Sequence, residues 1–268
     1  MSTSGTSLHS LVRIAFFLII WAVIWLPIAL AIVSWGKWQT AAPNKNPQKK
    51  LILLFPLYSL TPFLIWQLGL KGTTLTQIGI VLDAGLFQSI LSGYVLAIAS
   101  LSLVYLWEWG LGLLRFSPSN PLSLQTTIFL AAVGLFVAVA EESVFRGLFL
   151  YWLWQDYSRG VAATISSFLF AILHLIWERE NTIPQLPGLW LLGMVLCYAR
   201  SVDDNLLGMA IGLHGGWVFA LAYIDSCKLI CYKTTFPSWL VGSIQKPLAS
   251  LAGIGVMLLA AIALHFMA

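Results

Sequence analysis

Apolar runs about as long as a lipid bilayer is thick recur along the sequence, and they limit what the chain can fold into. A membrane-spanning helix needs about 20 mostly apolar residues. Backbone polar groups within hydrocarbon must find their hydrogen bonds inside the protein, which restricts spanning segments to helices and closed barrels. Only 9% of the 268 residues are charged, whereas soluble domains carry about 25%. The sequence therefore predicts an integral membrane protein.

The apolar runs predict an all-α fold. We expect a polytopic membrane helical bundle of seven or eight transmembrane helices, forming a single transmembrane domain over residues 1–268 with no β-sheet. The expected spans are 11–34, 51–70, 86–107, 126–154, 161–177, 186–198, 206–224 and 248–267. The first is longer than the roughly 7–15 apolar residues of a signal peptide and is expected to be retained. The fourth is unusually long, and residues 200–205 are expected to form a charged loop.

The formal net charge is +4, and most basic residues fall in the odd-numbered loops between the eight expected spans. Because cytoplasmic loops are enriched in Lys and Arg, this distribution places both termini on the non-cytoplasmic face. The basic balance thus fits basic cytoplasmic loops of a protein whose partner is the lipid bilayer. It does not indicate nucleic acid, for which the sequence holds no motif.

Three cysteines are present. Cys197 lies in an apolar run and is expected to be a small core residue. The spacing of Cys227 and Cys231 suits a disulfide or a redox pair, and suits two loop thiols of no special role equally well. No second pair of Cys or His residues stands at structural-zinc spacing, so no zinc site is predicted there.

A charged cluster interrupts the fourth apolar run. Glu141, Glu142 and Arg146 lie between two stretches of apolar residues, and ionisable groups in a membrane helix are usually functional because they are costly there. On a helix Glu142 and Arg146 share a face and can form an ion pair. Glu141 points about 100° away and is less neutralised, which suits a general base. The alternative is a structural network of ion pairs between helices.

Two histidines lie in later apolar runs. His174 ends the stretch Phe170–His174, and such a residue is by itself more often packed than catalytic. His214 lies among glycines 208, 212 and 216, whose spacing of four residues gives a smooth helix face for close packing. Either His214 belongs to an ordinary packing helix, or the glycines allow a close approach through which His214 meets His174 and Glu141 in one cavity.

Together these motifs resemble those of the CAAX protease and bacteriocin-processing (CPBP) family, also called the Abi family of intramembrane proteases. Glu-Glu-x3-Arg, Phe-x3-His and a glycine-flanked His follow one another as in the type II CAAX prenyl endopeptidases. The resemblance covers about residues 131–219, within core helices expected at 126–224. It implies an intramembrane glutamic endopeptidase in a plasma or thylakoid-type membrane, acting on a membrane protein or peptide.

The resemblance also implies a role for each residue of the cluster. Glu141 would activate the hydrolytic water, and the pair of Glu142 and Arg146 would orient it. His174 would help to hold the water or Glu141, and His214 would stabilise the oxyanion.

One position departs from the family pattern. The family often places an Asn four residues after the second His, as a further donor to the oxyanion, and this sequence has Val218. Valine cannot donate a hydrogen bond. Either another group takes the role or activity is reduced or absent; the groups considered are Trp217, Ser166, Ser167 and Asn205.

A metal-dependent reaction is an alternative. Glu141, His174 and His214 make up a His₂Glu set, which is the ligand set of several catalytic zinc sites. The sequence lacks the His-Glu-x-x-His helix that supplies both ligands and base in many zinc proteases. We therefore expect no metal and no other cofactor, with zinc as the less favoured possibility.

Two other functions compete with proteolysis. Val218 favours a non-catalytic scaffold of the same fold that assembles a membrane complex, for example a pigment-protein complex. Buried Glu and His residues also occur in transporters and proton relays, but the sequence shows no internal repeat of the kind many transporters have.

Overall fold

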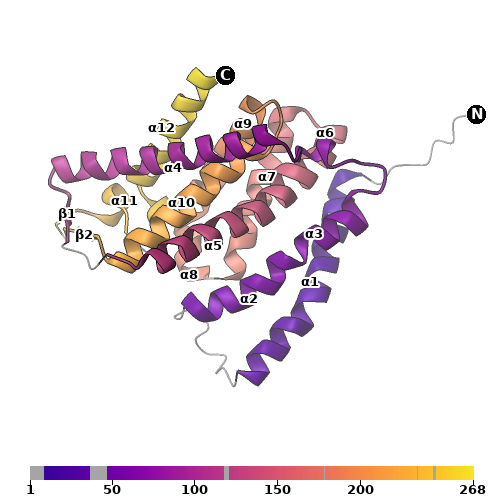
Figure 1. The fold of residues 1–268 in the computed structure, drawn as a ribbon, viewed down its shortest axis with the longest axis horizontal. Helices are drawn as coiled ribbons and strands as arrows, with labels where there is room; N and C mark the ends of the chain where they lie inside the picture. Colours follow the sequence, from indigo (N-terminus) through magenta and orange to yellow (C-terminus); the bar gives the residue numbers. More distant parts are fainter. Residues whose placement is uncertain (1–8, 37–46, 118–120, 178, 234, 244–245) are drawn as a thin grey trace, which may run out of the picture.

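The computed structural model describes residues 9–36, 47–117, 121–177, 179–233, 235–243 and 246–268. Helices make up most of these residues, which confirms the predicted all-α bundle (Figure 1). Within the described part, six helical stretches are long and apolar enough to cross a membrane by length and composition: 10–35, 49–69, 84–110, 124–156, 159–176 and 179–202. The last two predicted spans correspond to a glycine-rich helix and a shorter apolar helix.

The helices follow the predicted runs closely. They are α1 (Ser10–Trp35), α2 (Pro47–Ser59), α3 (Thr61–Leu64), α4 (Ala84–Gly110), α5 (Leu124–Glu142), α6 (Leu150–Asp156), α7 (Arg159–Leu173), α8 (Arg179–Thr182), α9 (Leu186–Val202), α10 (Gly208–Cys227), α11 (Ser238–Val241) and α12 (Leu251–Met267). The described residues also contain two π-helices, η2 (Ile65–Gly69) and η4 (Ser143–Phe149), and four short 3₁₀ turns, η3 (Thr76–Ile78), η5 (His174–Ile176), η6 (Ile183–Gln185) and η7 (Pro247–Ala249).

Helix α10 lies at the centre of the bundle between α4 and α5 (Figure 1). Every residue from Gly208 to Trp217 is buried. The predicted glycine face packs against α4: a methyl group on Gly212 would overlap the carbonyl oxygen of Ile90 and lie 2.8 Å from the nitrogen of Tyr94. This contact confirms the glycine-packing prediction.

Small residues on α4 meet the glycines of α10 in matching register. Ser89 faces Gly208, Gly93 faces Gly212, and Ala97 faces Gly216. Because both residue numbers rise together along the contact, the two helices run parallel. Small side chains on both partners let the backbones approach, as in other membrane helix pairs.

A two-stranded sheet lies where α4 and α10 end. Strand β1 (Leu114–Phe116) pairs antiparallel with β2 (Ile230–Tyr232), with Arg115 opposite Cys231. The prediction of no β-sheet is therefore wrong. The parallel helices bring their following loops side by side, and backbone groups there pair with each other. Three-residue strands are too short to leave an alternating pattern in the sequence.

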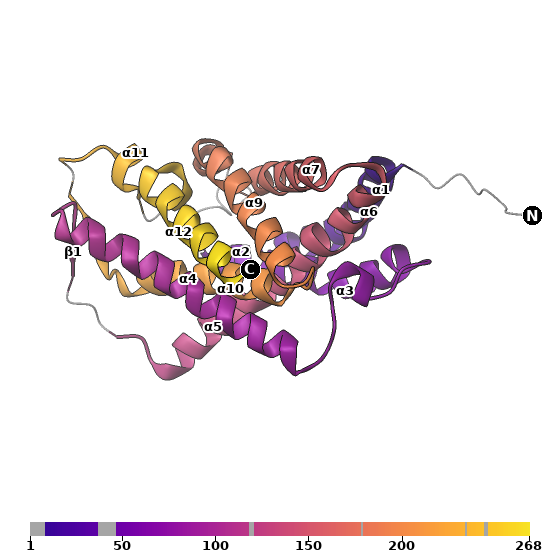
Figure 2. The same cartoon turned by 90° about the horizontal axis from the view of Figure 1, so that it is seen from above.

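The first helices form a pair beside α5 and α6. Helix α1 contacts α2 and α6, and α2 contacts α5 (Figures 1 and 2). The indole of Trp21 donates to the carbonyl of Leu57 at 2.9 Å, and that of Trp25 to the carbonyl of Leu53 at 3.1 Å. These bonds fix the rotation of α2, which sets the direction in which its side chains face α5.

The three cysteines are free. Cys227 is buried at the end of α10, and Cys231 is exposed on β2. The disulfide that their spacing would have allowed is thus not formed. Cys197 is buried in α9 among apolar residues, as expected for a small core residue.

The close contact of α4 and α10 predicts a large effect of Gly212→Ala. The added methyl group must push the two backbones apart, and such overpacking costs about 1–3 kcal/mol. Gly160→Ala in α7 is the matched control, because a methyl group there meets no atom within 4 Å. Thermal unfolding of the purified protein in detergent measures both. An equal melting temperature for the two variants would contradict the packing described here.

Candidate active site

The helix that carries the charged cluster changes its hydrogen-bonding pattern at the cluster. Helix α5 ends at Glu142, and the π-helix η4 begins at Ser143 and contains Arg146. Single π-helical turns within α-helices are rare and are frequent at functional sites. All seven residues of η4 are buried, as are Glu141 and Glu142. The predicted long fourth span is thus confirmed, with an irregular turn at its chemically distinctive point.

The carboxylate of Glu142 bonds to two side chains, those of Arg146 and His214. Its Oε1 lies 3.1 Å from Nη1 of Arg146 and accepts a hydrogen bond from Nδ1 of His214 at 2.7 Å. Glu142 and Arg146 have no solvent exposure. The predicted ion pair between Glu142 and Arg146 is confirmed, and the bond to His214 adds a link from the fourth span to α10.

Glu141 also faces the interior. Its Oε1 accepts a hydrogen bond from the hydroxyl of Tyr58 on α2. Its Oε2 lies 3.6 Å from Nε2 of His214. Only 5% of Glu141 is exposed. The carboxylate therefore lies between α2 and α10, in the interior of the bundle.

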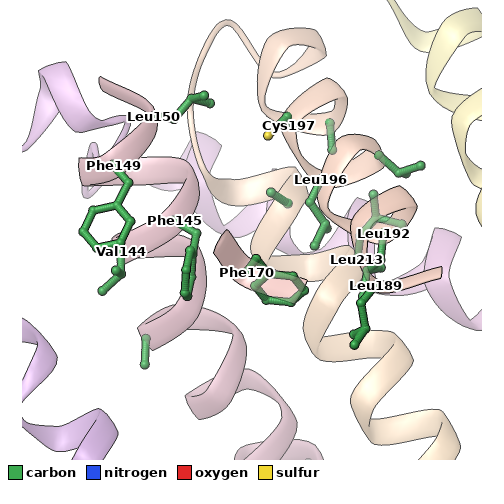
Figure 3. Packing of buried hydrophobic residues seen from close by; sticks show 14 of the residues in the cluster. Val144, Phe145, Phe149, Leu150, Phe170, Leu189, Leu192, Leu196, Cys197 and Leu213 are labelled. Atoms are coloured by element: carbon green, nitrogen blue, oxygen red, sulfur yellow. The ribbon is translucent and has the colours of Figure 1, made fainter. Parts of the chain in front are cut away.

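Phe170 connects the two histidines. Its ring centroid is 4.5 Å from that of His174 and 6.0 Å from that of His214. The guanidinium of Arg146 lies over the same ring at 4.3 Å. Figure 3 shows Phe170 facing Phe145 of η4, with apolar side chains of α9 on its other side. These rings form the apolar wall of the charged site.

The side chain of His174 is held by its own helix. Its Nδ1 bonds to the carbonyl oxygen of Phe170 at 2.8 Å. Glu141 and His214 lie within reach of an electrostatic interaction with His174. Because a carbonyl oxygen only accepts, Nδ1 carries the proton, and neutral His174 has its lone pair on Nε2. That nitrogen can accept a hydrogen bond from water.

Several polar atoms of the cluster are buried without a hydrogen-bond partner in the described part of the chain. They are Oε2 of Glu141, Oε2 of Glu142, and Nε and Nη2 of Arg146. Buried polar atoms are normally satisfied by protein groups or by ordered water. The cluster therefore has spare donors and acceptors for water or a polar ligand.

These residues fall within one segment that matches a known protein family. Residues 123–220 match the model of the Rce1-like family, described as type II CAAX prenyl endopeptidase Rce1-like. Over this segment the chain is similar to the CAAX protease family. No curated protein and no solved structure matches the chain. The matched segment covers less than half of the chain. It includes α5, η4, η5 and most of α10, which supply all five residues singled out in the sequence.

Whether a metal ion fits this site depends on the side chains that could bind it. No group of three or more His, Cys, Asp or Glu side chains in the described residues is arranged to hold a metal ion. Nδ1 of His174 and Nδ1 of His214 bond to other groups, as the second ring nitrogen of a metal-bound His usually does, so these two bonds do not decide between zinc and water. Whether the site works with water alone or with a metal is therefore a question for experiment.

Two of the four groups that could replace the family's Asn, Trp217 and Ser166, donate their hydrogen bonds outside the charged cluster. The indole of Trp217 donates to Oγ of Ser100 at 3.2 Å. The hydroxyl of Ser166 donates to the carbonyl oxygen of Phe145 at 2.8 Å. Val218 itself is half-buried on α10, one turn beyond His214.

The other two groups, Ser167 and Asn205, also contact residues outside the charged cluster. The hydroxyl of Ser167 lies 3.9 Å from the sulfur of Cys197. The side-chain oxygen of Asn205 accepts a hydrogen bond from Arg159 at 2.9 Å, on the exposed side of the turn before α10. None of the four groups bonds to Glu141, Glu142 or His214 in the described structure.

Arg200 is a residue that sequence reasoning placed wrongly. It was expected in a charged loop, but α9 extends to Val202 and Arg200 is 1% exposed. Its Nη1 donates to the carbonyl oxygens of Arg146 and Gly147, and its Nε donates to the carbonyl of Asn205 at 2.9 Å. A change from α- to π-helix leaves carbonyl groups without their usual donors. Arg200 and Ser166 together satisfy three successive carbonyls of η4.

Tyr58 is the second residue that sequence reasoning missed. It lies on α2, outside the family-matched segment, and is 7% exposed. The only signal in the sequence was a tyrosine in the middle of an apolar run, where a phenolic hydroxyl needs a partner. Nothing in the sequence indicated that the partner would be Glu141.

Arg200→Met is expected to destabilise the protein markedly. The change leaves buried carbonyl groups of η4 without a donor, at about 1–3 kcal/mol for each group. Arg200→Lys should not restore stability, because one ammonium group cannot reproduce the fork of the guanidinium. Arg115→Met, at an exposed residue of β1, is the control. Thermal unfolding in detergent gives the comparison, and equal melting temperatures for Arg200→Met and Arg115→Met would refute this role of Arg200.

Proposed function

We propose that the protein is an intramembrane endopeptidase that hydrolyses a peptide bond of a membrane-associated protein with water activated by Glu141. The observation that carries this proposal is the position of Glu141. One of its oxygens is buried, lacks a partner in the described structure and lies 3.6 Å from Nε2 of His214. The match to a protease family over the same residues supports it.

Glu141 acts as general base and then as general acid. Its Oε2 takes a proton from the water as the water oxygen bonds to the carbonyl carbon of the peptide. The carbonyl π bond opens, and its electron pair becomes the charge on an oxyanion. As that oxyanion collapses back to a carbonyl, the C–N bond breaks and Glu141 gives the proton to the leaving nitrogen. Such proton transfers contribute about 10²–10⁴-fold to rate.

His214 stabilises the oxyanion from the other side of the site. In its imidazolium form it donates one proton from Nδ1 to Glu142, at the 2.7 Å separation observed, and the other from Nε2 toward the reacting oxygen. Glu142 is fixed in turn by Arg146. The donor is thus held in place before the substrate arrives, which is what makes electrostatic stabilisation effective in a site of low polarity.

His174 orients the water. Because Nδ1 of His174 donates to the carbonyl of Phe170, Nε2 of His174 accepts a hydrogen bond from one O–H of the water. The second O–H of the water donates to Glu141. A water that donates both protons in fixed directions presents its lone pair to the substrate carbonyl. Proper orientation of reactants supplies a large part of the rate in reactions of this type.

Glu141→Gln tests the proposed function. The amide keeps the size of the side chain but cannot take a proton, so cleavage should fall by about 10²–10⁴-fold. Glu180→Gln changes an exposed glutamate of α8 and is the control. Purified variants are incubated with proteins of the host membrane, and new N-termini are identified by mass spectrometry.

The same experiment separates the protease from the scaffold alternative. If the wild type cleaves no membrane protein, and Glu141→Gln fully complements a deletion strain, the protein acts without proteolysis. Loss of both cleavage and complementation in Glu141→Gln, with Glu180→Gln unaffected, supports the protease.

A chelator tests the proposal that the water is activated without a metal. Because no three His, Cys, Asp or Glu side chains of the described residues are arranged to hold a metal ion, treatment with 1,10-phenanthroline followed by gel filtration should leave the cleavage rate unchanged. The rate is measured on a substrate found in the preceding experiment. Loss of activity that zinc restores would show instead that Glu141 and the histidines are metal ligands.

A further inference from the structure

The proposed reaction needs more than one donor at the oxyanion, and the family's second donor is missing. Removing one such donor typically lowers the rate about 10²–10³-fold. His214 can supply one hydrogen bond, whereas Val218 can supply none. Trp217, Ser166, Ser167 and Asn205 all have other surroundings. A donor other than these four groups is therefore needed if the site hydrolyses amides at a useful rate.

One further hydroxyl donor reaches the catalytic carboxylate. The phenol of Tyr58 donates to Oε1 of Glu141. Nε2 of His214 faces the other oxygen of the same carboxylate, Oε2, at 3.6 Å. Because both oxygens are bound to one carbon, Tyr58 and His214 flank a single small group from two sides. A peptide carbonyl attacked by a water held on Glu141 comes within the reach of both donors.

The hydroxyl of Tyr58 is held firmly in this position. Its ring packs edge-on against Phe136 of α5, with 6.3 Å between centroids. The neighbouring residue Leu57 is bound through its carbonyl to the indole of Trp21 at 2.9 Å. A donor fixed by its surroundings needs no reorganisation when charge develops, which is the property expected of an oxyanion-hole group.

We propose that the hydroxyl of Tyr58 is the second hydrogen-bond donor to the oxyanion, in place of the Asn that Val218 replaces. This inference rests on the proposed protease function. Before the reaction the negative charge is on Glu141, and Tyr58 donates to it. When the water proton moves to Glu141, the negative charge moves to the substrate oxygen, and the Tyr58 hydrogen bond follows it. The phenol keeps its proton throughout.

Tyr58→Phe tests this role with the smallest change available. It removes the hydroxyl and retains the ring against Phe136. We expect kcat to fall about 10²–10³-fold, with KM and the melting temperature little changed. Affinity for a phosphinic peptide, which mimics the tetrahedral intermediate, should fall in parallel with kcat/KM, since both report binding of the transition state. Tyr198→Phe, which removes a hydroxyl on α9, is the control.

Val218→Asn supplies the decisive comparison. Position 218 is one helical turn from His214 on the same face, so the amide can donate to the same oxyanion. In the Tyr58→Phe background it should restore about tenfold or more of the lost rate. In the wild-type background it should change the rate little, because Tyr58 already supplies the donor. An equally large gain in the wild type would overturn the inference, even if Tyr58→Phe alone does not fold.

Failure of this inference can be told from failure of the proposed function. If Glu141→Gln abolishes cleavage while Tyr58→Phe retains the full rate, the protein is a protease and Tyr58 is not a donor to the oxyanion. If Tyr58→Phe loses activity but keeps its affinity for the phosphinic peptide and is not rescued by Val218→Asn, Tyr58 acts only on Glu141 and the inference is wrong. If Glu141→Gln retains the full rate, the proposed function itself fails.

Discussion

The charge of Glu142 must be compensated inside a membrane helix, and much of the structure around it follows from that requirement. Its carboxylate has no solvent exposure and bonds to Arg146 on its own helix and to His214 on α10. Breaking a buried pair leaves an uncompensated charge and costs several kcal/mol. The hydrogen bond from His214 to Glu142 thus links α10 to α5, and it fixes the imidazole of His214 next to Glu141.

Two further features make this arrangement possible. Matching small residues on α4 and α10, such as Gly93 and Gly212, allow α10 to lie deep in the bundle. The π-helical turn η4 places Arg146 beneath the carboxylate, and its carbonyl groups are satisfied from outside the helix by Arg200 and Ser166. Residues far from the charged cluster in sequence therefore determine its geometry.

The sequence predicted the features that follow from residue spacing along one helix. It did not predict contacts that depend on how different helices are oriented against each other. The pair of Glu142 and Arg146 and the packing face of Gly212 follow from spacings of four residues. The bond from Tyr58 to Glu141 depends on how α2 turns against α5, which no local pattern encodes. Arg200 was expected in a loop because charged residues are rare in apolar helices. Its buried guanidinium is instead stabilised by hydrogen bonds to carbonyl oxygens of the π-helix η4, which is distant in sequence. The strands β1 and β2 were too short to show alternation.

The central claim is that Glu141 and His214 face one reacting group inside the membrane domain. An experimental structure of the protein with a bound phosphinic peptide tests it most directly. One phosphinate oxygen should lie within hydrogen-bond distance of Glu141, and the other within that distance of Nε2 of His214. A peptide bound elsewhere, or a Glu141 carboxylate turned toward the acyl chains, would contradict it.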